Sequence, residues 1–317
     1  MANVGDILPH CTGTGTSSDP YKYSTAEGFV EAIAVSSAYV EAAVENLSFD
    51  VNDGVIPSKI TINNTSLNGK GTTIRNLYTI GSGTLVSISN QNVSATIRNL
   101  NFYNMLLINN DSSTTRFVSL SKNDSYYTRV YNCNFTGVIR GSNFGNNVQP
   151  VYISNSYSSV DSWFQDCTFN FDIDVYGSLG YMFSGSRSNR HYLNNCTIKL
   201  SGTLHRDLTL IGTLIVQNCT IENPATNPLK SDGTTRTVYL SPSSSANYNY
   251  IKLHLTSTNL STSGQDQKTL INRSLISGGT LSTSGISMQE TDPTASDYIY
   301  NAQNLADAGF LVGTVIE

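Results

Sequence analysis

A short phrase of alternating apolar and polar residues recurs along this chain and constrains its fold more than any other feature. The phrase runs apolar, any residue, Asn or Asp, Leu or Cys, a small polar residue, and then usually an apolar residue. Its Leu or Cys stands at positions 47, 77, 100, 133, 167, 196 and 219, so successive copies are 23 to 34 residues apart. A period of this length predicts a solenoid or a propeller.

The alternation within each phrase is that of a β-strand, because strand side chains point to opposite faces in turn. One such phrase per repeat, with a recurrent Asn, favours an all-β, right-handed, single-stranded parallel β-helix over a propeller. Asn tolerates the left-handed backbone of a sharp corner, and stacked Asn side chains can bond amide to amide from coil to coil. The predicted ladder consists of Asn76, Asn99, Asn132, Asp166, Asn195 and Asn218, with Asp166 as a substitute for Asn.

Four cysteines occupy the Leu position of the later phrases: Cys133, Cys167, Cys196 and Cys219. They should point inward on successive coils, where stacked side chains run parallel and do not face each other. This arrangement predicts reduced, buried thiols that behave as small apolar groups. A zinc site is the alternative, but the chain has no CxxC pair and no companion His at ligand spacing. We therefore expect no metal and no cofactor.

The composition agrees with a solenoid whose surface is polar and carries little charge. Only 13% of the residues are charged, and the net charge is -5. Phosphate binding needs clustered Lys and Arg, so we expect no nucleic-acid partner. No apolar run is long enough for a membrane helix, and residues 1–20 lack the basic start and apolar core of a secretory signal. We therefore expect that the chain does not associate with a membrane. We also expect that it is made and folds in the cytoplasm.

The chain divides into three parts by pattern. Residues 1–40 form an N-terminal segment with a capping helix, residues 41–285 the β-helix, and residues 286–317 a C-terminal cap or oligomer contact. The helix is predicted from a capping box between Ser24 and Glu27, followed by Phe29, Val30 and Ile33 at helical spacing. A helix there would cover the open end of the solenoid. Segments 109–127, 141–162 and 172–190 are expected to leave the solenoid as loops or side strands.

The stretch before the helix carries a resemblance to known proteins. Gly13-Thr14, Asp19-Pro20-Tyr21 and Thr25-Ala26-Glu27 follow one another within residues 13–27. This order resembles the segment that precedes the repeats of right-handed parallel β-helix proteins of bacteriophages and bacterial surfaces, in the pectate-lyase-like superfamily. The resemblance implies a virion protein assembled in the host cytoplasm. Its implied partners are other virion proteins, further copies of itself, with a trimer favoured, and a host cell-surface glycan.

Catalytic motifs of the β-helix enzymes are not found in the chain. The polygalacturonase-like Asn-Thr-Asp, Asp-Asp and Arg-Ile-Lys patterns and the pectate lyase Arg-x-Pro-x-x-Arg pattern are absent from the sequence. Glycoside hydrolysis in general needs two carboxylates about 5–9.5 Å apart. Asp161, Asp172 and Asp174 are the candidates that such an enzyme would use, while a solvated strand face is the simpler interpretation. We expect no catalytic residue.

Aromatic residues are the remaining signal, since the chain has 18 Tyr and one Trp. Their flat apolar faces with polar tips suit sugar stacking and protein contacts, although some could stack along the solenoid as spacers. The candidates for facing a ligand are Tyr126, Tyr127, Tyr152, Tyr157, Trp163, Tyr176 and Tyr181.

Three functions remain open from the sequence. The first is a structural or binding protein of a phage particle, as a tail spike, fibre module or head decoration. The second is a tail-spike polysaccharide depolymerase, and the third is a bacterial surface adhesin. The missing catalytic motifs and the cytoplasmic start favour the first.

Overall fold

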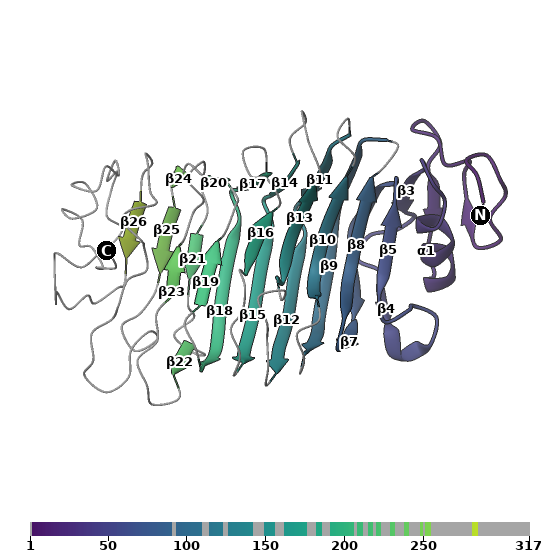
Figure 1. Cartoon of the computed structure of the whole chain (residues 1–317). Helices are drawn as coiled ribbons and strands as arrows, with labels where there is room; N and C mark the ends of the chain where they lie inside the picture. The colour runs from purple at the N-terminus through teal and green to yellow at the C-terminus, as the bar shows by residue number, and fades with distance from the viewer. Residues whose placement is uncertain are drawn as a thin grey trace, which may run out of the picture.

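A computed structural model of the 317-residue chain gives an elongated parallel β-solenoid (Figure 1). Successive strands lie side by side from the N-terminal end toward β26 (Leu281–Ser284). The structure describes residues 2–90, 93–109, 114–122, 126–141, 149–155, 162–175, 182–185, 191–205, 208–211, 215–217, 220–222, 229–231, 238–240, 248–249, 251–254 and 281–284. The expected C-terminal segment, 286–317, lies outside these residues.

The N-terminal end of the solenoid is closed by one helix and one short strand. The strand β1 (Cys11–Thr12) pairs antiparallel with β2 (Tyr21–Tyr23), which pairs in parallel with β3 (Tyr39–Ala42). Between β2 and β3, α1 (Ala26–Ile33) buries Phe29, Ala32 and Ile33 against the first coil. Helix α1 covers the end of the core at the first coil, so it serves as the cap that the sequence predicts.

The cap of α1 begins one residue later than the sequence pattern indicates. Thr25, and not Ser24, is the N-cap residue, and its side-chain oxygen accepts a hydrogen bond from the backbone N–H of Gly28 at 3.2 Å. Glu27 lies in the first turn, where the pKa of its carboxyl is lowered by its own backbone N–H and by the Thr25 hydroxyl. The predicted helix is therefore present, with Thr25 in the role that was assigned to Ser24.

Within the described residues, the strands of the solenoid form three parallel columns. The first column contains β2, β3, residues 66–68 of β6 (Ser66–Arg75), residues 95–98 of β9 (Ala95–Ile108), β11 (Thr128–Tyr131), β14 (Ser162–Gln165), β17 (His191–Asn194), β20 (Ile215–Gln217) and β24 (Tyr248–Asn249).

The second column follows the first around the corner. It contains β4 (Ser48–Asp50), residues 72–75 of β6, residues 100–103 of β9, β12 (Asn134–Gly141), β15 (Thr168–Val175), β18 (Thr197–Leu204), β21 (Thr220–Glu222), β25 (Ile251–His254) and β26. The short strands β7 (Tyr78–Ile80) and β22 (Leu229–Ser231) extend it beside β9 and β18. A single turn of 3-10 helix, Val51–Asp53, follows β4.

The third column is a separate sheet that completes each coil. It contains β5 (Ile60–Asn63), β8 (Gly83–Asn90), β10 (Thr115–Lys122), β13 (Val151–Asn155), β16 (Phe183–Gly185), β19 (Leu208–Ile211) and β23 (Val238–Leu240). The strands β10, β13 and β16 fall inside the segments 109–127, 141–162 and 172–190. Those segments therefore hold the third face of the solenoid, in addition to any residues that leave it.

The core is filled by the inward residues of all three columns. In the second column Phe102, Phe135 and Phe169 stand in register and are buried, with neighbouring ring centroids 5.2 Å apart and nearly parallel. Burying each ring stabilises the fold by about 1.5–3 kcal/mol, and each stacked pair adds about 0.5–1.5 kcal/mol. Because the same side chain recurs at the same place, one coil provides the packing surface for the next.

The described cysteines of the repeat point inward, as the alternation predicts. Cys133, Cys167 and Cys196 are buried free thiols. Each thiol donates to a backbone carbonyl oxygen two residues earlier, at 3.2 Å for Cys133, 3.3 Å for Cys167 and 3.4 Å for Cys196. Burial raises the pKa of the Cys133 thiol to about 12. Cys219 lies outside the described residues.

Candidate functional site

The corner between the first two columns is built from residues in the left-handed backbone conformation. Their φ angles are 57° at Asn46, 47° at Lys70, 58° at Asn99, 46° at Asn132, 55° at Asp166 and 51° at Asn195. Asn and Asp adopt this conformation more readily than other residues with a side chain. The recurrent Asn of the sequence phrase is thus explained by backbone geometry at one corner.

Side-chain amides at this corner bond to one another between coils. The Asn132 side chain donates to the Asn99 side-chain oxygen at 2.8 Å, and Asn99 in turn donates to Asn68 at 2.9 Å. Asn195 donates to the Asp166 carboxylate. A carboxylate has no N–H to donate, so Asp166 can only accept hydrogen bonds in this ladder. Asn218 lies outside the described residues.

Asn76 does not belong to this ladder. Its side chain donates to the Asp50 carboxylate at 2.7 Å and accepts from the Asn104 side chain at 2.6 Å. In the coil that contains Asn76, the corner residue is Lys70. The registers of β6 and β9 shift between Asn68 and Thr72, so the phrase at Asn76 marks a second corner, one strand further along the coil. Asn68 occupies the place below Asn99 that the sequence assigned to Asn76.

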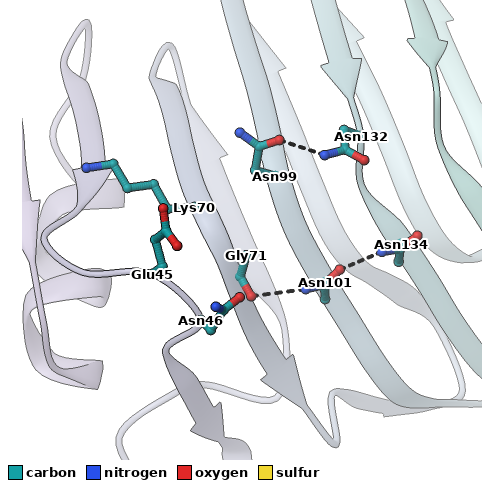
Figure 2. Close-up of a pocket in the computed structure, with 8 residues that line it drawn as sticks. All are labelled: Glu45, Asn46, Lys70, Gly71, Asn99, Asn101, Asn132 and Asn134. Carbon is teal, nitrogen blue, oxygen red and sulfur yellow. Dashed lines mark hydrogen bonds between the residues drawn. The ribbon is translucent and has the colours of Figure 1, made fainter.

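A second amide row runs beside the first, and the two rows border a groove of about 410 Å³. In the second row Asn134 donates to the Asn101 side-chain oxygen at 2.6 Å, and Asn101 donates to the backbone oxygen of Gly71 at 3.0 Å. Figure 2 shows both rows, with Lys70 and Glu45 at the N-terminal end of the groove. We call this the corner groove; its lining residues are Glu45, Asn46, Lys70, Gly71, Asn99, Asn101, Asn132 and Asn134.

The outer surface of the first column carries a second groove beside the corner groove. Alternation directs one set of side chains into the core and the other set outward, and we call the outward set the aromatic face. Its residues are Tyr39 and Glu41 of β3, Ser66 and Asn68 of β6, Thr96 and Arg98 of β9, Arg129 and Tyr131 of β11, and Trp163 and Gln165 of β14. A groove of about 350 Å³ follows this face and is lined in part by Tyr39, Asn68, Arg98 and Tyr127.

The aromatic face contains an arginine held between two aromatic rings. The Arg129 guanidinium carbon lies 3.8 Å from the ring centroid of Tyr127 and 3.9 Å from that of Trp163. Tyr131 meets the Trp163 ring edge-on, with 6.2 Å between centroids. The three aromatic side chains come from two neighbouring coils, whose register places Arg129 opposite Trp163. The result is a layered cluster of flat, partly exposed groups.

The structure brings only some of the predicted aromatic residues together. Tyr127 and Trp163 meet at Arg129, and Tyr126 precedes Tyr127 with a partly exposed side chain. Tyr152 belongs to the third column, where the Arg116 guanidinium carbon lies 4.1 Å from its ring centroid. The residues Tyr157, Tyr176 and Tyr181 lie outside the described part of the chain.

The candidate carboxylates are engaged in contacts with side chains of neighbouring coils. Asp172 forms an ion pair with Arg140 at 2.7 Å, and Asp174 accepts from the His205 imidazole at 2.8 Å. Both point outward from β15, as the alternation predicts, and Asp172 borders a groove of about 180 Å³ together with Tyr103, Asn170 and Ser201. Asp161 lies outside the described residues.

The arginines of these surfaces were missed by the sequence reasoning. The sequence pattern singles out Tyr, Trp and carboxylates, and neither Arg129 nor Arg116 belongs to these residue types. A signal for Arg129 exists: it stands three residues before Asn132, and Trp163 stands three residues before Asp166. Equal distance from the corner residue puts the two side chains opposite each other in a parallel solenoid.

The described residues contain neither a candidate metal cluster nor a helix that could span a membrane. Among them, no three His, Cys, Asp or Glu side chains are grouped so that they could hold a metal ion. No helix in the same residues has the length and apolar character needed to cross a membrane.

Comparisons with known proteins complete the description. No protein-family model matches the chain. No curated protein matches it either. Among solved structures, the chain is similar to the crystal structure of a putative immunoglobulin A1 protease from Bacteroides ovatus, with a TM-score of 0.49 and 14% sequence identity over 93% of this chain and 88% of that chain.

Proposed function

We propose that this chain is a non-catalytic carbohydrate-binding protein, which presents its aromatic face and corner groove to a glycan. The observation that carries the proposal is the cluster of Tyr127, Arg129 and Trp163 beside two adjoining grooves lined by polar side chains. Sugars combine apolar ring faces with hydroxyl groups, so they are bound by aromatic surfaces flanked by a few hydrogen-bonding groups.

The dimensions of the two surfaces suit an extended ligand. From β3 to β14 the aromatic face crosses five coils, and four steps of about 4.8 Å make a length of about 19 Å. Within the two rows Asn99 and Asn101 each donate one hydrogen bond and accept one, and an amide has further donor and acceptor capacity. The surface therefore offers stacking groups along its length and amide groups along one margin.

The setting that we propose is a bacteriophage particle. The support is the order of residues 13–27, which resembles the segment before the repeats of phage and bacterial surface β-helix proteins, and the closed N-terminal end that this segment forms. A tail spike, a fibre module and a head decoration would all present such a face outward. Electron cryomicroscopy of purified phage particles tests the setting: the chain resolved on a particle supports it, and a chain found on no particle would leave the adhesin as its role.

Glycan binding is tested on an array of bacterial polysaccharides probed with the intact chain. We expect binding by wild type, and a loss of about three- to tenfold for Tyr127→Ala, because stacked aromatic contacts each contribute about 0.5–1.5 kcal/mol and this one also orders Arg129. Tyr152→Ala is the matched control, since Tyr152 stacks on Arg116 in the third column, away from both grooves. Equal loss in the two variants would contradict the assignment of the face.

A depolymerase is the second candidate, favoured by the groove that Asp172 borders with Tyr103 nearby. Its test is the appearance of new reducing ends or unsaturated sugars when the chain is incubated with the polysaccharide that it binds. We expect none. Cleavage that disappears in Asp172→Asn or Asp174→Asn, with binding retained, would replace the non-catalytic function by this one.

A further inference from the structure

We infer that the glycan recognised by the aromatic face is anionic, with its carboxylate or phosphate oxygens bound at the edge of the Arg129 guanidinium. This inference rests on the proposed function and names the ligand class for the same surface. Its basis is the position of one cation between two rings, together with the charge of the surface around it.

Both flat faces of the Arg129 guanidinium are covered, which leaves its edge for a ligand. Tyr127 and Trp163 lie 3.8 and 3.9 Å from the guanidinium carbon. The Nε of Arg129 is buried and has no hydrogen-bond partner in the described part of the chain, whereas its two terminal nitrogens are not buried. Those two nitrogens also make no hydrogen bond or ion pair within the described residues. They present two parallel donors, the geometry that carboxylate and phosphate oxygens accept.

Partial removal from water strengthens the preference for an anion. A guanidinium between two rings has lost water from both faces, so a hydrogen bond to an oxyanion at its edge replaces little hydration. The rings also fix the guanidinium plane, so a ligand pays little side-chain entropy to orient it. The indole nitrogen of Trp163 is likewise buried without a partner among the described residues. The cluster therefore has buried N–H donors that no acceptor of the described residues satisfies.

The neighbouring charges on the aromatic face are also positive. Arg98 is exposed, lines the groove one coil below Arg129, and makes no ion pair with the described residues. Glu41 is the acidic residue of this face. Its carboxylate forms an ion pair with Lys70, with 3.1 Å between Lys70 Nζ and Glu41 Oε1. The chain as a whole has a net charge of -5, so a positive face stands out against an acidic background. An acidic polysaccharide is attracted to this face and repelled by the rest of the surface.

The experiment uses the intact chain and three sets of oligosaccharides on one array: uronate-containing, phosphate-substituted and neutral. The tightest acidic binder is then titrated calorimetrically, and its carboxyl-reduced or dephosphorylated form is titrated beside it. The variants are Arg129→Gln, which removes the charge, and Arg129→Lys, which keeps the charge but loses the two parallel N–H donors of the guanidinium. Arg116→Gln is the control, because Arg116 also stacks on an aromatic ring, that of Tyr152, but does so in the third column.

We expect acidic binders only, with affinity reduced about 10- to 100-fold by Arg129→Gln, clearly by Arg129→Lys, and not by Arg116→Gln. Neutralising the ligand should cause a similar loss in the wild-type chain, a result that does not depend on any variant folding correctly. The uronate and phosphate sets tell which oxyanion is recognised. Neutral glycans bound equally well, with no effect of Arg129→Gln, would overturn the inference and leave the proposed function standing. No glycan binding at all would overturn both.

Discussion

The Asn132 side chain donates a hydrogen bond of 2.8 Å to the side-chain oxygen of Asn99, the corresponding residue one coil away. Both residues have the left-handed backbone, with φ of 46° and 58°. One residue type therefore meets two demands at each corner: it tolerates the backbone conformation, and it bonds to its counterpart in the next coil. These two contributions can be separated by substitution.

Asn132→Ala should lower the free energy of unfolding by about 2–3 kcal/mol. Roughly 1–2 kcal/mol comes from placing a Cβ-bearing residue without local hydrogen bonding in the left-handed region, and about 1 kcal/mol from the lost hydrogen bond. Asn132→Gly removes the hydrogen bond but suits the backbone, so it should cost distinctly less. Urea denaturation of both variants measures the difference. Equal destabilisation by Ala and Gly would show that backbone conformation is not what selects Asn here.

Phe135→Ala should destabilise the chain by about 3–5 kcal/mol, because it removes a ring from the middle of a buried stack and leaves a cavity. Phe135→Leu keeps most of the apolar volume, so it should cost distinctly less, about 1.5 kcal/mol. The measurement is again the denaturation midpoint. A cost for Leu as large as that for Ala would mean that ring stacking, and not volume, determines the packing of these coils.

The first two columns could be predicted from the sequence because their residues repeat at fixed distances from the corner. The backbone at a sharp corner restricts the residue type, and the alternation on either side then fixes which side chains are buried. Cys133, Cys167 and Cys196 lie inside for this reason. The closing helix could also be predicted, although Thr25 took the capping role assigned to Ser24.

The third column and the aromatic cluster could not be predicted in the same way. Val118 of β10 and Val151 of β13 stand in register and both lie 19 residues past their corner residues, but Phe183 of β16 lies 17 residues past its own, so the spacing is not kept along the column. Asn76 fits the phrase but marks another corner, because an irregular register between β6 and β9 displaces the coil. The cluster at Arg129 depends on which residues of separate coils stand opposite one another, and this requires the register.

Gly202→Ala should be far more destabilising than Gly54→Ala, although both glycines have positive φ, 107° and 82°. A Cβ at Gly202 would lie 2.1 Å from the backbone oxygen of Ile173 in the adjacent coil, whereas a Cβ at Gly54 would meet no atom within 4 Å. The Gly54 variant should lose only the roughly 1–2 kcal/mol of the left-handed conformation. The Gly202 variant should lose about 1–3 kcal/mol more, because two coils must separate. Similar denaturation midpoints for the two would contradict this close approach.

The attachment of the N-terminal segment to α1 should depend on pH through His10 and Glu31. The His10 imidazole lies 2.6 Å from one Glu31 carboxylate oxygen, and the His10 backbone N–H donates to the other at 3.0 Å. Glu31 raises the pKa of His10 above its ordinary value of 6.5, and His10 lowers the pKa of Glu31 below 4.5.

The sign of the effect follows from these two directions. A raised His pKa stabilises the attachment below pH 6.5, and this stabilisation is lost as the pH rises through the raised value. A lowered Glu pKa stabilises it above pH 4.5, and this stabilisation is lost as the pH falls through the lowered value. Between these limits the imidazolium and the carboxylate are both charged. The attachment should therefore be strongest from about pH 4.5 to 6.5 and weaken on either side.

Proton NMR titration of the His10 imidazole measures this directly, with the resonance assigned by its loss in His10→Gln. We expect the titration midpoint of His10 to fall toward 6.5 in Glu31→Gln, because the neutral amide no longer favours the protonated ring. The protection factors of the backbone amides near His10, which correct for the intrinsic pH dependence of exchange, should be highest inside the same pH window in the wild-type chain and should not vary with pH in Glu31→Gln. An unchanged midpoint in that variant would mean that the pair does not persist in solution and that other contacts, such as the β1–β2 pairing, hold the segment in place.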